Sequence, residues 1–564
     1  MALLDWVVIT LFALALIGII VWVMRQKQNN AADYFLGGKD ATWIAIGASI
    51  FASNIGSEHL IGLAGSGASS GMAMAHWEIQ GWMILILGWV FVPFYSRSMV
   101  YTMPEFLERR FNPQSRTILA TISLISYVLT KVAVTVYAGG LVFQQVFGID
   151  KLWGIDFFWI AAVGLVLITA LYTIFGGMKS VLYTSVLQTP ILLLGSLIIL
   201  VLGLKELGGW EEMMRICSSA KVNEYGDTMV NLIRDNNDAQ YPWLGALIGS
   251  AVIGFWYWCT DQFIVQRVLS GKNEKEARRG TIFGAYLKLL PVFLFLIPGM
   301  IAFALHQKLG SFLPMLPSGL PNSDAAFPTL VAKLLPAGIK GLIVCGILAA
   351  LMSSLASLFN SSAALFTIDF YQRFKPKTDP KRLVKIGQAA TVVIVILGIL
   401  WIPVMRSIGD VLYLYLQDVQ SVLAPGIAAA FLLGIVWKRA SAQGGMWALL
   451  TGMIIGLTRL GAKIYYSNLG VEAGASENPS IFQQIFYDEN WLFFCGWMLL
   501  LCLAVGFVVS MCTKAPDASK IQGLVFGTST PEQRLATRHS WNAWDIVNSI
   551  IILGITVAFY IYFW

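Results

Sequence analysis

Asn54-Ile55-Gly56-Ser57-Glu58 is the stretch that decides the fold, because it interrupts an apolar segment, 43–65, with an amide, a glycine, a hydroxyl and a carboxylate. A second apolar segment, 243–269, is interrupted in a similar way at 258–261, five predicted helices further along the chain. Interrupted hydrophobic segments at matching places in two halves are typical of an inverted-repeat transporter whose site lies at mid-membrane. We therefore expect helices two to six and helices seven to eleven to form two repeats.

The composition is that of a chain whose solvent is mostly lipid. Of the 564 residues, 57% are hydrophobic and 12% are charged, whereas soluble domains carry about 25% charged residues. A spanning helix needs roughly 20 mostly apolar residues, and about fourteen stretches qualify. They predict an all-α membrane protein with spans at 4–24, 43–65, 79–95, 119–147, 158–175, 183–202, 243–269, 282–305, 341–371, 384–405, 411–437, 444–465, 491–511 and 544–563.

Lysine and arginine are concentrated in every second loop between these spans. Basic residues in short loops stay on the cytoplasmic side, so the loops around 211–238 and 470–490, and both termini, are expected outside. The first span is interpreted as a retained helix, because Arg25 and Lys27 follow it instead of preceding it. The short loops favour a bacterial source and hence the cell inner membrane, while an animal source would imply the plasma membrane.

Several function classes find no support in the sequence. The six cysteines lack metal-ligand spacing, and we interpret them as core thiols. The sequence contains no nucleotide-binding glycine-rich loop with a lysine, which is the kind of loop that binds ATP. The net charge of +7 belongs to short loops at the membrane surface. We expect no enzyme, no nucleic-acid partner and no organic cofactor.

Ionisable side chains inside the predicted spans mark a polar path. Each costs at least about 2.5 kcal/mol on insertion scales unless it has a partner or a wet cavity. They are Glu58, His59, Glu78, Asp261, Lys288, Asp369 and Asp418. Together they favour a hydrated pathway, while any single one can equally be a structural ion pair.

Two hydroxyls in the predicted ninth helix lie where an ion site can form. Ala350, Ser353 and Ser354 occupy positions i, i+3 and i+4 and share one helix face. If the second helix unwinds at Ala52 and Ile55, their freed carbonyls complete about five oxygen ligands, which suit sodium. Small residues at this spacing more often serve close helix packing, so the spacing alone favours packing.

A sugar-like substrate needs hydrogen-bonding groups and an aromatic face beside its C–H groups. The polar candidates are Glu78, His59, Lys288 and Gln417, and the aromatic candidates are Trp77, Tyr257, Trp258 and Tyr413. The alternative is that the aromatics are core or interface residues and that Lys288 snorkels or pairs with an acid. The composition alone favours neither interpretation.

Short motifs then show a family resemblance. They are Asp33-Tyr34-Phe35-Leu36-Gly37-Gly38-Lys39, Ala52-Ser53-Asn54-Ile55-Gly56-Ser57-Glu58, Gly65-Ser66-Gly67, Tyr257-Trp258-Cys259-Thr260-Asp261-Gln262, Gln266-Arg267, Lys288-Leu289, Ser353-Ser354-Leu355-Ala356-Ser357 and Pro425-Gly426. Over nearly the whole chain they resemble the sodium:solute symporter family, and within it the sodium/glucose cotransporters. The resemblance implies a LeuT-type 5+5 inverted-repeat fold.

The implied organisation has five parts. They are the first helix with a cytoplasmic linker (1–42), the first repeat (43–204), an extracellular loop (205–242), the second repeat (243–437) and peripheral helices 12 to 14 (438–564).

By the same resemblance, each candidate residue receives a role. Sodium would be held by the carbonyls of Ala52, Ile55 and Ala350 and the hydroxyls of Ser353 and Ser354. The substrate would be bound by Asn54, His59, Glu78, Lys288, Gln417, Tyr257 and Trp258, with Tyr257 as an inner gate supported by Trp258. The outer gate would be Leu63, Trp77 and Tyr413.

Three positions depart from the family pattern. Gly81 stands where the bacterial galactose carrier has a hydroxyl ligand, and Gly254 replaces a polar sugar contact, so some hydrogen bonds to ring hydroxyls are expected to differ. Ser185 stands where many members carry an aspartate tied to ion coupling or to a second sodium site. Its neutrality argues for a single sodium ion per transport cycle.

The sequence therefore predicts sodium-coupled symport of a neutral hexose, of the glucose or galactose type, into the cell by alternating access. Sodium is both the transported and the coupling ion, the bilayer is the surroundings, and a monomer is the expected working unit. Alternatives within transport are myo-inositol, sialic acid or another polyol or anion. An alternative of another class is a membrane sugar sensor, for which a soluble output domain would be expected, or an uncoupled channel.

Overall fold

Two helix breaks lie at the centre of the structure, which is a computed structural model. The first follows α3 (Trp43–Asn54), where Ile55 is extended with φ −82° and ψ 108°, and the chain resumes as η2 (Glu58–Leu63). The second separates η6 (Phe255–Thr260) from α14 (Gln262–Leu269) at Asp261, whose φ is −77° and ψ 129°. Extended backbone inside a span frees carbonyl and amide groups that a helix would pair. Both predicted interruptions are therefore confirmed as breaks.

The structure describes residues 2–26, 28–56, 58–316, 319–408, 412–471, 473–474 and 478–564, without the side chains of residues 129–130, 138, 141, 145–146, 404–408 and 412–418. Here α marks an α-helix, η a 3₁₀- or π-helix and β a strand. The elements of the first part are α1 (Leu3–Met24), α2 (Ala31–Phe35), η1 (Gly37–Lys39), α3, η2, α4 (Ala64–Ser70), η3 (Gly71–Met74), α5 (Ala75–Glu78), α6 (Gly81–Ile86), η4 (Leu87–Phe91), α7 (Val92–Ser98), α8 (Met103–Arg110), α9 (Pro113–Ser126), η5 (Tyr127–Val132), α10 (Ala133–Phe147), β1 (Lys151–Leu152), β2 (Ile155–Asp156), α11 (Phe157–Leu207) and α12 (Trp210–Ser219). The elements of the second part are α13 (Trp243–Gly254), η6, α14, α15 (Glu274–Lys288), η7 (Val292–Leu296), α16 (Ile297–Leu309), η8 (Ser323–Ala325), α17 (Ala326–Leu334), α18 (Ile339–Ala364), η9 (Leu365–Tyr371), α19 (Gln372–Phe374), α20 (Pro380–Ile408), α21 (Leu412–Val436), α22 (Ala442–Asn468), α23 (Ile481–Gln483), η10 (Gln484–Asp488), α24 (Trp491–Cys512), α25 (Ala518–Ile521), α26 (Pro531–His539) and α27 (Ala543–Tyr562).

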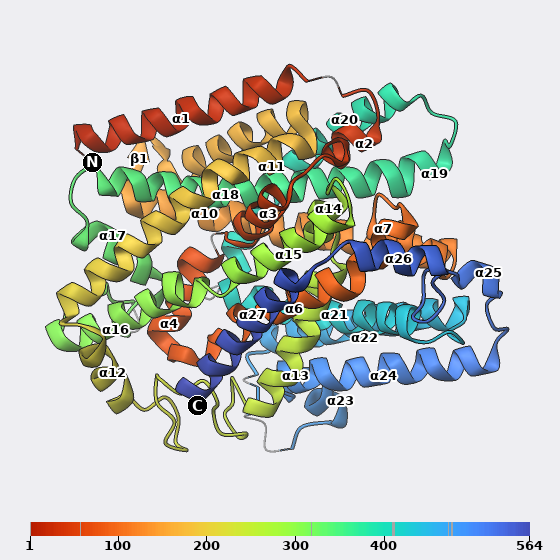
Figure 1. The fold of residues 1–564 in the computed structure, drawn as a ribbon. Coiled ribbons are helices and arrows are strands. Elements are labelled where there is room, and N and C mark those ends of the chain that lie inside the picture. Colours follow the sequence, from red (N-terminus) through yellow and green to blue (C-terminus); the bar gives the residue numbers. More distant parts are fainter. Residues whose placement is uncertain are drawn as a thin grey trace.

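Helix α18 forms the centre of the core (Figure 1). It packs against α11, α1, α20 and α3, and nearly every side chain along it is buried. A helix that is apolar on all sides is stable only when other helices surround it. On one side of this core α1 lies along the edge, and on the other side α21, α22 and α24 pack together as a separate group.

The 51-residue helix α11 contains both of the predicted spans 158–175 and 183–202. It is kinked at Gly177, where φ is +53°. A Cβ atom at this position would overlap the backbone oxygen of Tyr34, and a positive φ is unfavourable for any residue but glycine. Gly177 therefore lets two spans join without an intervening loop.

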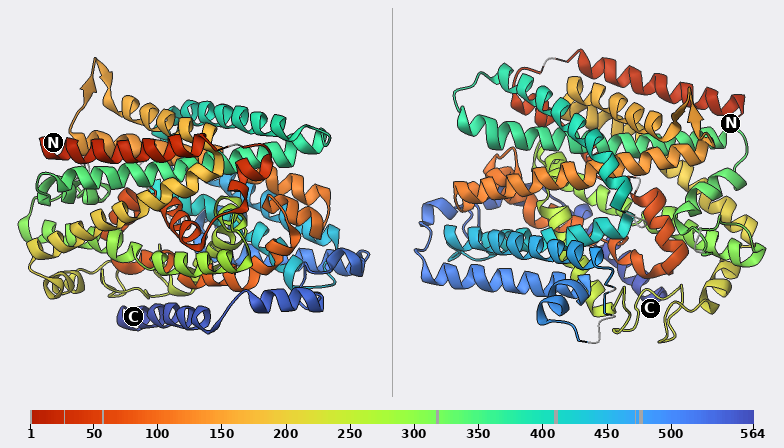
Figure 2. Two further views of the ribbon diagram at one scale, coloured as in Figure 1. Left: turned by 45° about the horizontal axis from the view of Figure 1, so that its top comes forward. Right: turned by 180° about the vertical axis from the view of Figure 1, so that it is seen from behind.

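Eleven described segments are helical, long and apolar enough to cross a membrane, and two shorter apolar helices cover Trp43–Asn54 and Ala133–Gln144. The chain is thus a multi-pass membrane protein, and the count of about fourteen spans stays a prediction. Both termini lie at the end of the molecule that carries β1 and α12, opposite α19 and α25, and two further views agree (Figures 1 and 2). Next to the C-terminal residue, the Phe563 oxygen accepts a hydrogen bond from the Leu232 amide, 2.8 Å away, in the segment after α12.

Candidate functional site

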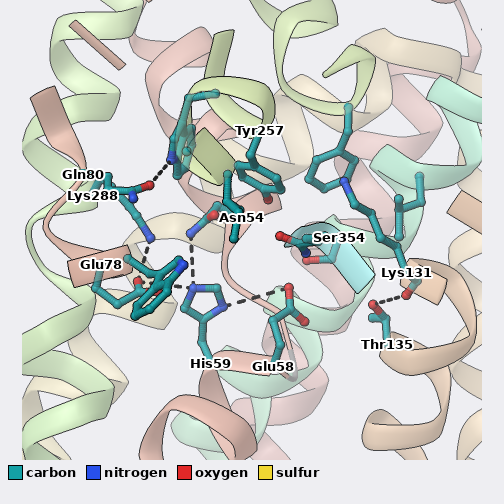
Figure 3. Close-up of a pocket in the computed structure, with 17 residues that line it drawn as sticks. Asn54, Glu58, His59, Glu78, Gln80, Lys131, Thr135, Tyr257, Lys288 and Ser354 are labelled. Atoms are coloured by element: carbon teal, nitrogen blue, oxygen red, sulfur yellow. Dashed lines mark hydrogen bonds and ion pairs between the residues drawn. The ribbon is translucent and has the colours of Figure 1, made fainter. Parts of the chain in front are cut away.

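A cavity lies where the two helix breaks meet (Figure 3). Its lining comes from α3, η2, α5, η5, α10, α13, η6, α14, α15, α18 and α21, and comprises Asn54, Glu58, His59, Trp77, Glu78, Gln80, Lys131, Thr135, Ile253, Gly254, Tyr257, Trp258, Phe263, Lys288, Ser354, Leu358 and Gln420. Three π-helical segments, η2, η5 and η6, contribute to this wall. Such segments shift the helix register and often occur at functional sites.

Four of the predicted polar residues meet in one buried cluster. Lys288 Nζ donates to Glu78 Oε2 at 2.6 Å, and His59 Nε2 lies 3.4 Å from the same oxygen. Asn54 Nδ2 is 3.3 Å from His59 Nε2. Each of these side chains is buried, and a buried charge is tolerated only with a partner of this kind. Lys288 therefore pairs with an acid, and that acid faces the cavity.

The aromatic candidates form one wall of the same cavity. The rings of Tyr257 and Trp258 meet edge to face, with centroids 4.9 Å apart, and Lys288 Nζ lies 5.3 Å from the centroid of Trp258. Trp258 Nε1 donates to Gln80 Oε1 at 3.2 Å, and Gln80 Nε2 donates to the Ser250 oxygen at 2.7 Å. Gln80 was absent from the predicted set.

The structure gives packing reasons, not visible in the sequence, for glycine at positions 254 and 81. A Cβ at Gly254 would overlap the side-chain amide of Gln80. At Gly81 a Cβ would lie 2.8 Å from the Ala285 oxygen on α15. Gly254 thus leaves room for the side chain of Gln80, which lies between α5 and α6 and lines the cavity.

The predicted outer gate is described in part. Trp77 lines the cavity and stacks on Trp491, with ring centroids 5.5 Å apart and an interplanar angle of 18°. Leu63 is buried at the end of η2 and is not among the described lining residues. The side chains of Tyr413, Gln417 and Asp418 lie outside the described residues; Gln420, one turn further along α21, lines the cavity.

The five predicted sodium ligands lie on α3, at its break, and on α18. Ser354 Oγ is 3.2 Å from the Ile55 oxygen and 3.0 Å from the Ser53 oxygen. Ser353 Oγ is 3.2 Å from Ser185 Oγ on α11. Ala52 and Ala350 are buried on α3 and α18, which pack together. Carbonyl and hydroxyl oxygens of this kind fit a sodium ion.

A buried ion pair at the wall of the cavity was only half predicted. Lys131 Nζ lies 2.6 Å from Asp261 Oδ2, and the Tyr127 hydroxyl donates to Asp261 Oδ1. The ammonium also lies 4.9 Å from the ring centroids of Tyr257 and Phe263. Asp261 was expected as an intramembrane acid, and the signal for Lys131 was equally available, because it is a lysine within the predicted span 119–147.

Asp369 has the structural role that was kept as an alternative. Its Oδ1 accepts hydrogen bonds from Arg116 Nε at 2.7 Å and Thr102 Oγ1 at 2.9 Å. It is not among the described residues that line the cavity. Asp369 therefore ties η9 to α9 and to the start of α8.

The comparisons with known proteins agree with this architecture. Residues 34–452 match the model of the sodium:solute symporter family. The chain is 36% identical over 549 residues to the sodium/myo-inositol cotransporter 2 of Homo sapiens, covering 93% of this chain and 79% of that one. It is also 36% identical over 529 residues to the sodium/myo-inositol cotransporter of Bos taurus, covering 89% and 72%.

Solved structures share the fold at lower sequence identity. A substrate-bound, outward-open Na⁺-coupled sialic acid symporter gives a TM-score of 0.72 at 23% identity, covering 92% of this chain and 99% of that one. The crystal structure of MhsT in complex with L-phenylalanine gives a TM-score of 0.50 at 13% identity, covering 84% of this chain and 99% of that one. These likenesses concern the fold, which is that of LeuT-like sodium symporters.

Proposed function

The chain belongs to the sodium:solute symporter family, and from this premise we propose that it couples sodium entry to the uptake of a neutral, ring-shaped polyol. As a sodium-coupled solute symporter it is a transporter and not an enzyme. The assignment of a polyol as the substrate rests on one observation. This is the buried cluster of Glu78, Lys288, His59 and Asn54 beside Tyr257 and Trp258. Such a cluster offers both donors and acceptors to hydroxyl groups and an aromatic face to C–H groups.

Myo-inositol is the first substrate to test, and glucose and galactose are tested beside it. Relatives at 36% identity are named as sodium/myo-inositol cotransporters, whereas the motifs of the sequence favoured a hexose. Both are uncharged six-membered rings carrying hydroxyls. Lys288 is neutralised by Glu78 at 2.6 Å, which disfavours a carboxylate substrate such as sialic acid.

Sodium would bind at Ala52, Ile55, Ala350, Ser353 and Ser354. Asn54 and His59 lie on either side of the same helix break that carries Ile55, so an ion there orders the segment that contacts the substrate. By reciprocity the substrate then tightens sodium binding as much as sodium tightens substrate binding. The neutral Ser185 beside Ser353 supports one sodium per cycle.

The driving force is sufficient for accumulation. One positive charge that enters supplies about 2.3 kcal/mol per 100 mV of membrane potential. Because about 1.4 kcal/mol corresponds to tenfold, this alone supports roughly a fortyfold gradient of a neutral solute.

We further propose the inner membrane as the location of the protein, with both termini outside. The two repeats would be 43–204 and 243–437, and the working unit would be a monomer.

Uptake into proteoliposomes tests the proposal. Labelled myo-inositol, glucose and galactose are offered with an inward Na⁺ gradient and with K⁺ in its place. We expect at least one of them to accumulate above its external concentration, only with Na⁺. Ser354→Ala, which removes a sodium-ligand hydroxyl, should raise the half-saturating Na⁺ concentration about tenfold, while Ser467→Ala, exposed on α22, should transport as the wild type.

Two results would contradict the proposal. Accumulation that persists with K⁺ would exclude sodium coupling. A folded protein that accumulates none of the three solutes would exclude the polyol assignment, and anions and amino acids would then be tested.

A further inference from the structure

Three buried polar atoms in the cavity have no hydrogen-bond partner among the described residues. They are Glu58 Oε2, His59 Nδ1 and Trp77 Nε1. The other carboxylate oxygen of Glu58, Oε1, lies 4.0 Å from His59 Nδ1, which is too long for a hydrogen bond. Buried polar groups in native proteins are almost always satisfied. Atoms left unsatisfied in a cavity therefore indicate what its ligand has to supply.

Glu58 differs from the other acid that lines the cavity. Glu78 is engaged by Lys288 and His59, whereas Glu58 has an oxygen without a partner. The close-up shows Glu58 directly beside His59 at the cavity wall (Figure 3). None of the roles assigned to sodium, substrate or gate residues includes Glu58.

The helix break holds Glu58 where a ligand can reach it. Glu58 is the first residue of η2, just after the extended segment that follows α3. Its carboxylate lies against Gly56, where a Cβ would overlap Glu58 Oε2. Any other residue at position 56 would displace the carboxylate. Gly56 thus leaves space for the carboxylate of Glu58, in addition to lying in the helix break.

The chemistry of the three atoms is complementary to hydroxyl groups. A carboxylate oxygen accepts, an indole N–H donates, and an imidazole nitrogen does either according to its tautomer. A hydroxyl both donates and accepts, so a ring that carries hydroxyls along its edge satisfies all three. A substrate carboxylate only accepts, and it would meet Glu58 as a like charge.

We propose that Glu58 contacts the substrate directly, accepts a hydrogen bond from one ring hydroxyl, and thereby selects neutral polyols against carboxylate-bearing solutes. The two lysines that line the cavity do not offset this selection. Lys288 is paired with Glu78, and Lys131 with Asp261, at 2.6 Å each. The inference rests on the proposed function, because it takes the same cavity as the substrate site.

A functional double-mutant cycle tests this contact. Uptake of myo-inositol, or of glucose if that is the transported solute, is measured in the wild type, Glu58→Ala and Glu58→Gln, with each monodeoxy analogue as a competitor. We expect Glu58→Ala to raise KM for the parent substrate about tenfold. One deoxy analogue should bind the wild type about tenfold more weakly than the parent and bind Glu58→Ala equally well.

The charge of Glu58 is tested separately. Glucuronate should compete poorly in the wild type and several-fold better in Glu58→Gln, because the like charge is gone. The matched control is Glu211→Gln on the exposed face of α12, which should leave both properties unchanged. Size-exclusion profiles and the sodium response of each variant establish that it is folded.

Several outcomes would overturn the inference. An equal loss for the parent and every deoxy analogue in Glu58→Ala would mean that Glu58 only supports the fold. A changed sodium affinity, measured by tryptophan fluorescence without substrate, together with unchanged analogue discrimination, would mean that it serves the cation. If the wild type accumulates no polyol, the proposed function fails as well; if it does and the cycle shows no coupling, only the role of Glu58 fails.

Discussion

At the residue scale, the partners of each polar side chain separate structural groups from those available to a ligand. Asp369 is engaged through its Oδ1 by Arg116 and Thr102 away from the cavity, while Glu78 is engaged within it. Both are acids inside apolar segments, and their surroundings alone distinguish them. The same reasoning applies to glycines, whose role depends on which atoms approach them.

Gly254 offers a test at this scale. In Gly254→Ala the new methyl group would overlap the amide of Gln80 and displace it from Trp258 and Ser250. Each lost hydrogen bond is worth about 1 kcal/mol, so we expect KM for the substrate to rise roughly three- to tenfold at nearly constant maximal rate. Gly461→Ala, where a Cβ would meet nothing within 4 Å, is the control. Unchanged kinetics in both variants would show that Gln80 does not support the substrate wall.

At the scale of elements, the site depends on contacts between segments that are distant in sequence. The π-helical η5 meets the second helix break through Lys131 and Asp261, and the ammonium lies 4.9 Å from the ring centroids of both Tyr257 and Phe263. Any movement of η6 away from η5 has to separate this pair. The pair therefore connects the inner wall of the cavity to the position of the break.

We expect Lys131→Ala to destabilise the protein strongly, because it leaves Asp261 buried without its cation, at a cost of about 3–5 kcal/mol. The double variant Lys131→Ala/Asp261→Asn should recover part of the lost thermal stability, since the uncompensated charge is then removed. Arg215→Ala, which breaks the exposed pair with Glu212 on α12, is the control and should leave Tm unchanged. Equal Tm values for the single and double variants would argue against a charge effect.

A pH effect is expected where η8 packs on α4. Burial raises the pKa of Asp324 from 3.8 to about 6, and its carboxylate approaches Gly65 closely. Between these pKa values the folded protein holds a proton that the unfolded chain has released, so this group lowers stability as pH rises through that window. Asp324→Asn should therefore be more stable than the wild type above pH 6, by roughly 3 kcal/mol, and similar below pH 4. Thermal melts across pH test this, with the exposed Asp150→Asn as control; parallel curves would contradict it.

At the scale of the whole molecule, the two ends of the helix bundle carry different elements and loops. β1, α12 and both termini lie at one end, and α19 and α25 at the other (Figure 1). The basic loops predicted to be cytoplasmic include those around α19 and α25. This charge distribution predicts that the end carrying α19 and α25 faces the cytoplasm, because basic residues in short loops remain inside.

The native cysteines allow this orientation to be measured. Cys512, at the end of α24, is exposed, and the other five cysteines are buried. A membrane-impermeant maleimide should label the wild type in inside-out vesicles and leave it unlabelled in right-side-out vesicles. Cys512→Ser should abolish labelling, and a cysteine introduced at the exposed Ser219 of α12 should show the opposite sidedness. Labelling of Cys512 from outside would reverse the predicted topology.

Much of the site was predictable from residue types. Asn54, His59, Glu78, Lys288, Tyr257 and Trp258 were all expected, and all line one cavity. Gln80 and Lys131 were missed: the amide of Gln80 is unremarkable in sequence, and its role depends on the space left by Gly254. The family motifs supplied the rest of the expectation, including the sodium ligands, which stay a prediction.

The sequence by itself determined that the chain is a multi-pass helical membrane protein, that two of its helices are interrupted, and that acidic side chains lie at both interruptions. Hydropathy and helix-breaking residues act locally, so these features can be read along the chain. Only the tertiary structure decided which charges are paired, which glycines make room for side chains, and which atoms are left for a ligand. Pairing and packing depend on contacts between residues such as Glu78 and Lys288 or Lys131 and Asp261, whose distance along the chain says nothing about their distance in space.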